Sequence, residues 1–318
     1  MKRMQAPWKS VVAAVVICAP AIKAAGQDEP YRTRLDTAVS LNRLGTVDVS
    51  LHAGKVNITG GSGSQVRIRA VTAGDRIEFD ATAGRVRLSA EPDGHRSYQH
   101  RPRGRRSRGG GEQAEFNLTV PVGTRVVVET ISASVSIAAV RGEVNVESVS
   151  GSIEIADAVR KVFAESVSGS LSISRVAGDV RAEAVSGSLS MNGVAGEINS
   201  ETVSGRIGIT NASSRSVLAE SVSGRISYDG TFDPAGSYVF KSHSGSLTLS
   251  LPARAGATLR LETFSGHVNS DFPVTLQPDA SFGPRDKRVE FKIGNGRSRI
   301  IAETFSGSIR IQRIGGRE

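Results

Sequence analysis

Glutamate recurs along this 318-residue chain at a nearly constant spacing, four residues before a glycine or alanine. The clearest run has intervals of 18 or 19 residues and consists of Glu147, Glu165, Glu183, Glu201 and Glu220. If each interval is one turn of stacked strands, the carboxylates form a column with a step of about 4.8 Å, where neighbours repel by roughly 1 kcal/mol in water. Such a column either binds cations such as Ca²⁺ or lies at a solvated strand edge. One carboxylate per turn lacks the clustered ligands of a strong site, so we expect the solvated edge, no metal and no cofactor.

A serine directly precedes each of these glycines, at Ser150, Ser168, Ser186, Ser204 and Ser223. The hydroxyls suit hydrogen bonds within a turn, and as a row they would also suit a glycan. Catalytic motifs are missing from the sequence: the histidines fall at unrelated positions, and no serine stands in a nucleophile-elbow or Ser-x-x-Lys motif. The sequence also lacks a phosphate-binding loop, an HExxH zinc motif and a dinucleotide fingerprint. We therefore expect a protein that is not an enzyme.

The main enzymatic alternative is a polysaccharide-acting β-helix protein, which needs two or three carboxylates or basic groups converging on one face. Asp75, Glu78 and Asp80 are the nearest candidates in the sequence. Glu78 and Asp80 flank Phe79, however, and this alternation more simply places them on the outer face of a strand.

Most of the excess positive charge lies in two segments. The formal net charge is +9, and residues 1–26 carry four of the positive charges with no acid. Six more, again with no acid, lie between His95 and Gly111, at Arg96, Arg101, Arg103, Arg105, Arg106 and Arg108. We expect residues 95–113 to be a flexible Arg/Gly-rich insertion, with contact to an anionic envelope polymer or lipid as the alternative. We expect no nucleic-acid partner, because the pattern of residues 1–26 predicts export.

Residues 1–26 have the three-part layout of a secretory signal peptide. Lys2, Arg3 and Lys9 precede an apolar run over 11–22, and the small residues 24–26 follow it. We expect cleavage near Gln27 and an extracytoplasmic location, either periplasmic or at the cell surface or secreted, with no membrane-spanning segment afterwards. An uncleaved anchor is one alternative. Lipidation at Cys18, the single cysteine, is another, although Ile17 before it is not the small residue that this processing needs.

An internal repeat dominates the sequence from residue 114 onward. Repeated sequence segments such as ESVSGSLSI, which we call repeat words, place turn glycines at Gly151, Gly169, Gly187, Gly205, Gly224, Gly245, Gly266 and Gly307. Around them, apolar residues alternate with polar ones, as Leu171 and Ile173 do, which is a strand pattern. We predict an all-β chain, folded as a single-domain parallel β-solenoid with turns of about 18 residues and two short strands each. An antiparallel sandwich is the rival, but it does not require one residue type at a fixed phase.

Two features of the repeat concern the corner between its strands. The glycines are expected to need either a positive φ or a close approach of neighbouring backbones. Val149, Val167, Val185 and Val203 stand at one phase just before the Ser-Gly pair, where we expect inward side chains that close a corner of the core.

The remaining boundaries follow from irregular spacing. Residues 27–94 read as an N-terminal capping β region, with Gly54 and Gly84 in the glycine position of the repeat. Residues 114–318 hold the regular repeats, and the wide last interval indicates an inserted loop near 271–288, rich in proline and polar residues.

These words resemble the bacterial putative-adhesin family, a β-strand-repeat domain of unknown function. Its marks are a strand ending in Val-Pro-x-Gly, here Val120 to Gly123, followed by words of the form Ser-Val-Ser-Gly-x-Ile-x-Ile. The resemblance covers roughly Thr46 to Ile311. It implies a β-strand-repeat fold in a protein that is exported or membrane-tethered, and it supplies no catalytic residues.

The sequence thus favours an exported, non-enzymatic scaffold with an adhesin-like binding or structural role in the bacterial cell envelope. Its partners would be envelope polysaccharide, anionic lipid or another envelope protein. The polysaccharide-acting enzyme and an envelope sensor or assembly partner remain the alternatives. The oligomeric state stays open.

Overall fold

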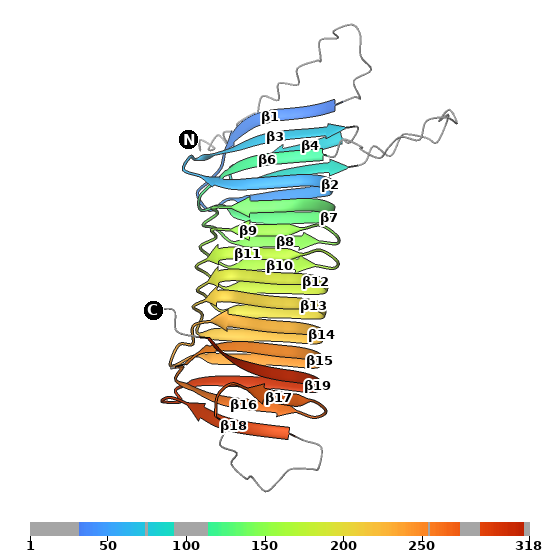
Figure 1. Ribbon diagram of the computed structural model, residues 1–318. Coiled ribbons are helices and arrows are strands. Elements are labelled where there is room, and N and C mark those ends of the chain that lie inside the picture. Colours follow the sequence, from blue (N-terminus) through green and yellow to red (C-terminus); the bar gives the residue numbers. More distant parts are fainter. Residues whose placement is uncertain (1–31, 74–75, 92–113, 254, 274–286, 315–318) are drawn as a thin grey trace, which may run out of the picture.

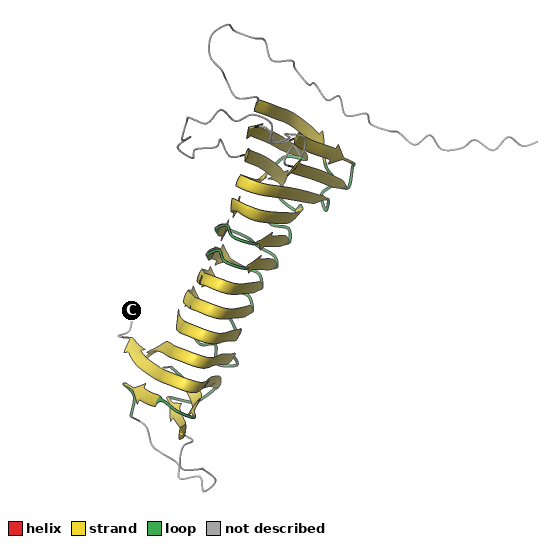
Figure 2. Ribbon diagram, turned by 90° about the vertical axis from the view of Figure 1, so that its right-hand side faces the viewer, coloured by secondary structure: helices red, strands yellow, loops and turns green. Residues whose placement is uncertain are grey.

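The computed structural model describes residues 32–73, 76–91, 114–253, 255–273 and 287–314, and every regular element in these ranges is a strand. The all-β class is therefore confirmed. Figures 1 and 2 show the strands stacked one above another in a long, narrow body. Within the described residues, no helix is long and apolar enough to cross a membrane. The predicted signal peptide (1–26) and Arg/Gly-rich insertion (95–113) lie outside the described residues.

The middle of the stack is built from parallel strands in an 18-residue register. Val162 pairs with Val180, and Val180 pairs with Ile198. The strands of this region are β7 (Arg125–Ala138), β8 (Val144–Ser148), β9 (Ile153–Ala156), β10 (Val162–Ser166), β11 (Leu171–Val176), β12 (Val180–Val194), β13 (Ile198–Ala212), β14 (Ser216–Gly230) and β15 (Ser237–Pro252). Within this region, two short strands per turn, as predicted, occur from β8 to β11. In β12 to β15 the ladder continues through the corner, since Ser186 and Gly187 pair with Ser204 and Gly205, so each turn is one long bent strand.

The interior is filled by the inward residues of each alternating strand. Val162 and Ala164 of β10 face inward in one half of a turn, and Leu171 and Ile173 of β11 do so in the other. Because these residues are small or aliphatic, the body is thin, and it depends on stacking to cover the inward side chains and to pair the edges of every strand.

At the C-terminal end, the order of strands along the stack departs from their order in the sequence. Here the strands are β16 (Ala257–Thr263), β17 (His267–Ser270), β18 (Lys287–Ile293) and β19 (Ser298–Ile314). β19 pairs in parallel with β15 on one side and with β16 and β17 on the other. The last strand is thus inserted between two earlier ones (Figure 1), so the order of the repeats along the stack is not their order in the sequence. Of the inserted loop expected near 271–288, residues 274–286 lie outside the described residues, whereas Arg288 belongs to β18.

The N-terminal end has a similar arrangement. Its strands are β1 (Arg32–Ser40), β2 (Thr46–Gly61), β3 (Gln65–Ala73), β4 (Arg76–Ala81), β5 (Arg85–Glu91) and β6 (Ala114–Pro121). The long strand β2 lies between β7 and the pair formed by β5 and β6. Antiparallel strands finish both ends: β4 pairs with β5, β3 with β1 and β6, and β18 with β16. A change of strand direction at the end of the ladder limits further parallel pairing with another chain.

The two glycines singled out in this N-terminal region take different positions. Gly54 lies beside Ala133 in the ladder, which is the glycine position of the repeat. Gly84 instead precedes β5, and its carbonyl accepts a hydrogen bond from the Thr46 N–H, so it lies at the opposite corner. The prediction for Gly84 is therefore wrong.

Candidate functional site

The corner after the first strand of each turn presents the same side chains in the same directions. In the turn of Glu165, the glutamate faces out, Ser166 is buried and Val167 faces out again. Val149, Val167, Val185 and Val203 are between 42% and 48% exposed, so the prediction that they close the core is wrong. Strict alternation continues into the corner and gives the inward position to the small polar residue instead.

In two turns, those of Ser148 and Ser166, the inward serine is explained by the backbone of the corner. The Gly169 N–H donates a hydrogen bond to Ser166 Oγ at 2.8 Å, and the Gly151 N–H donates to Ser148 Oγ at 3.1 Å. Because a buried N–H needs an acceptor, a hydroxyl serves this position better than an apolar side chain. The adjacent exposed serines bond along the stack, since Ser150 Oγ donates to the Ile131 carbonyl at 3.2 Å.

The turn glycines are required by close backbone approach. A Cβ on Gly169 would lie 1.8 Å from the carbonyl oxygen of Gly151, and one on Gly187 would lie 2.0 Å from that of Gly169. Positive φ occurs among the described glycines at Gly54, Gly193, Gly294 and Gly296, and none of these belongs to the series from Gly151 to Gly307. Of the two expectations for these turns, the positive φ is wrong.

The glutamates stand side by side in the ladder. Glu147 pairs with Glu165, and the column continues through Glu183, Glu201 and Glu220. Glu129 extends it at one end, and Lys241, Glu303 and Glu262 extend it at the other. We call this set the glutamate column.

Basic groups of the same chain neutralise part of this column. Lys241 Nζ lies 3.0 Å from Glu220 Oε1, Arg288 lies 2.9 Å from Glu262, and Arg181 pairs with Glu183. The hydrogen bond to Glu220 raises the pKa of Lys241, and the bond to Glu183 raises the pKa of Arg181. Over the described residues, no three His, Cys, Asp or Glu side chains gather as metal ligands would. The intrachain cations thus relieve the repulsion that motivated the Ca²⁺ hypothesis.

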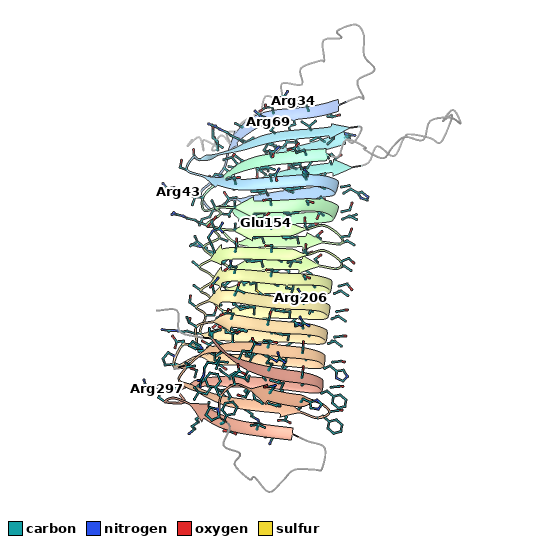
Figure 3. All side chains as sticks on the ribbon, in the orientation of Figure 1. Arg34, Arg43, Arg69, Glu154, Arg206 and Arg297 are labelled. Atoms are coloured by element: carbon teal, nitrogen blue, oxygen red, sulfur yellow. The ribbon has the colours of Figure 1, made fainter. Side chains whose placement is uncertain are left out.

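Beside the glutamate column runs a line of exposed apolar side chains, which we call the apolar ridge. Its members are Ile131, Val149, Val167, Val185, Val203, Val222, Phe305 and Phe264. Between column and ridge lies an open groove of about 800 Å³, the corner groove, with a floor of buried serine and threonine such as Thr202 and Ser221. Figure 3 shows side chains projecting as a regular series along this edge of the stack. The groove joins a carboxylate wall to an apolar wall in the part of the stack that runs from β10 to β19.

The ridge ends in a stack of rings that depends on the unusual strand order. The His243 and Phe305 centroids are 5.0 Å apart with 4° between the planes, and Phe264 follows 4.9 Å from Phe305 at 7°. β19 supplies the central ring of this stack. The glycine spacing contains no signal for this insertion, which is why sequence reasoning missed the ring stack.

The other candidates from the sequence do not join this surface. Asp75 lies outside the described residues, and Glu78 and Asp80 lie on β4, where Ile77 and Phe79 pack against the core. The six arginines Arg96, Arg101, Arg103, Arg105, Arg106 and Arg108 also lie outside the described residues. The strands on either side of them can be placed, since Ala90 pairs with Leu51 and Ala114 with Gly54, so β5 ends and β6 begins at the corner that carries the ridge.

Comparison with known proteins gives a family and distant similarities to solved structures. Residues 48–312 match the family model described as Toastrack DUF4097. A structure titled a putative cell adhesion protein from Clostridium sporogenes is 13% identical, with a TM-score of 0.29, over 89% of this chain and 100% of that one. One titled a putative adhesin from Bacteroides fragilis is 11% identical, with a TM-score of 0.35, over 89% of this chain and 98% of that one. No curated protein matches. Since the family model spans most of the chain, from β2 to β19, the protein belongs to the Toastrack DUF4097 family.

Proposed function

We propose that this protein is an exported, non-enzymatic scaffold that folds as one β-solenoid domain and has an adhesin-like binding or structural role in the bacterial cell envelope. The observation that carries the proposal is the corner of β12 to β15, where the ladder is unbroken and each turn repeats the same exposed side chains in register with the next. A rigid series of identical positions suits contact with an extended or repetitive partner.

A binding role is supported by the openness of the corner groove. It is shallow and long, and its walls repeat every turn, whereas a catalytic site brings unlike groups together at one point. The glutamates at its edge stand in line along the stack and share one outward direction. This arrangement suits many weak, equivalent contacts.

The location and partners are part of the same proposal. The signal-peptide pattern of residues 1–26 supports an extracytoplasmic location, in the periplasm or at the cell surface. The arginines of residues 96–108 suit an anionic polysaccharide or lipid headgroup, and the flanking strands β5 and β6 end and begin at the corner that carries the ridge. Another envelope protein is the further partner that the corner groove would suit.

A binding and turnover experiment tests this function. The protein, purified from the extracytoplasmic fraction of cells that express the full chain, is incubated with isolated cell envelopes and with their polysaccharide and lipid fractions. We expect saturable retention on at least one fraction and no release of reducing ends or soluble fragments from the polysaccharide. Retention on none of the fractions would contradict the binding role, and fragment release that scales with protein concentration would show an enzyme.

A further inference from the structure

We propose that the apolar ridge and the corner groove form a self-association surface, at which two copies of this chain lie side by side with their stacks pointing in the same direction. This inference goes beyond the proposed function, because it needs no envelope ligand and is tested on the purified protein.

Exposed apolar surface is concentrated on this one line. Ten large apolar side chains of the described residues are exposed, and eight of them form the ridge; the other two are Leu44 and Val159. A monomeric protein rarely leaves a continuous apolar strip of this length in water, and such strips mark interaction sites. The ridge therefore requires a partner that covers it along the stack.

The spacing of the ridge selects the kind of partner. Consecutive ridge residues, such as Val203 and Val222, occupy neighbouring rungs of the parallel ladder. Their step is about 4.8 Å, whereas side chains on one face of an extended peptide repeat every 6.6 Å or so, and the two fall out of step within a few rungs. A second parallel ladder keeps step over the whole length, and a second copy of this chain supplies one.

The shape of the corner is self-complementary. A ridge runs directly beside a groove, so a two-fold axis parallel to the stack places the ridge of each copy in the groove of the other. Both copies then cover the same set of side chains. The contact repeats in every turn from β10 to β19.

The charges beside the ridge fix the direction of the second copy. Glutamates stand on one side of the ridge, and on the other side, five residues later in the same turns, stand the exposed Arg206 and Arg225. With both stacks pointing the same way, Glu201 of each copy faces Arg206 of the other, and Glu220 faces Arg225. With the stacks opposed, the two glutamate columns would face each other, and like charges disfavour that arrangement.

Cysteine cross-linking distinguishes these arrangements, since the chain outside residues 1–26 contains no cysteine. Single variants Val185→Cys, Val203→Cys and Val222→Cys are prepared from the exported protein, with Ser172→Cys on the exposed outer face of β11 as the control. Mild oxidation is expected to give covalent dimers from all three ridge variants and none from the control. With opposed stacks, equivalent residues of the two copies meet only at the rung where the two-fold axis crosses the ridge. Dimers from only one of the ridge variants would therefore indicate opposed stacks and would overturn the proposed direction.

Sedimentation velocity over a range of concentrations provides the second readout. We expect the unmodified protein to form dimers and the Val203→Ser/Val222→Ser variant to remain monomeric with a nearly unchanged melting temperature. The Arg206→Glu/Arg225→Glu variant places glutamate opposite glutamate, and salt screens this repulsion. Its dimer is therefore expected to be weaker in low salt than in high salt. Arg141→Glu/Arg160→Glu, which changes exposed arginines at the opposite corner, is expected to dimerise like the unmodified protein. A protein that is monomeric at every concentration, or dimers that the ridge variant leaves intact, would overturn the proposal.

Discussion

The Cβ position of Gly187 lies 2.0 Å from the carbonyl oxygen of Gly169, one turn earlier in the stack. The same closeness recurs between Gly205 and Gly187 at 1.9 Å and between Gly224 and Gly205 at 1.8 Å. A methyl group at any of these positions must displace backbone, since its nearest contact is a main-chain oxygen held in the ladder. The distance between turns at this corner is thus set by the absence of side chains.

Replacing one of these glycines should loosen the stack. Gly187→Ala is expected to lower the free energy of unfolding by about 2 kcal/mol, because the new methyl group forces two turns apart. Ser188→Ala, at the next and exposed position, should change it by less than about 0.5 kcal/mol. Denaturant titrations of the two variants make the comparison. Equal midpoints would show that the close approach relaxes at no cost.

The inward polar residue of the corner gives a second prediction, which differs between turns. Ser166→Ala removes the acceptor of the Gly169 N–H and should destabilise by about 1 kcal/mol. Ser221 occupies the same position three turns later, where its buried hydroxyl has no hydrogen-bond partner, so Ser221→Ala should not destabilise. Thermal melts of both variants check this, and an equal loss in the two would contradict the capping role of Ser166.

Part of this architecture could be predicted from spacing. The constant interval between Glu165 and Glu183 or between Gly169 and Gly187 required them to be neighbours in a ladder, and they are. The direction of Val167 could not be predicted, because apolar character alone suggests burial, while the hydrogen bond needed by the Gly169 N–H assigns the inward position to Ser166. Local alternation overrides hydrophobicity at this corner.

The order of the strands in the stack could not be predicted from the repeat pattern. Gly245, Gly266 and Gly307 all carry the repeat signature, yet Gly307 lies between the other two in the stack. Because the repeats share the same corner sequence, that sequence does not specify which turns are adjacent in the stack. The stacking of His243 and Phe264 on Phe305 depends on this strand order, so it could not be predicted from the sequence.

The pair between Lys241 and Glu220 gives a pH-dependent prediction. The pKa of Lys241 is raised above its ordinary value of 10.5 by the hydrogen bond to Glu220, so its stabilisation is present at neutral pH and is lost as the pH rises through the raised pKa. Because both side chains are more than a third exposed, solvent screening limits the contribution to about 0.5 kcal/mol.

Lys241→Gln should therefore lower stability slightly at pH 7 and have no effect well above pH 10.5. Lys161→Gln, at an exposed lysine of the opposite corner, serves as the control. Chemical denaturation at the two pH values measures the difference. A deficit of the same size at both pH values would show that Lys241 contributes through packing of its alkyl chain and not through its charge.

The Arg/Gly-rich segment should be dispensable for stability. Deleting residues 95–111 removes six positive charges and almost no apolar side chain, and it leaves five residues between β5 and β6. In β2 only two residues separate Leu51 from Gly54, which pair with Ala90 and Ala114, so five residues are enough to connect the ends. We expect an unchanged melting temperature and weaker, less salt-sensitive binding to anionic vesicles or lipopolysaccharide. Unfolding of the deletion variant would assign a structural role to the segment.

Location is the most direct test of the central claim, which is that this chain leaves the cytoplasm and acts as a scaffold in the envelope. The full chain with a C-terminal tag is expressed in a bacterial host, the cell compartments are separated, and the intact mass of the recovered protein is measured. The account predicts recovery from the extracytoplasmic and envelope fractions, with a mass that corresponds to a chain beginning near Gln27. Recovery from the cytoplasm with residues 1–26 still attached would contradict it.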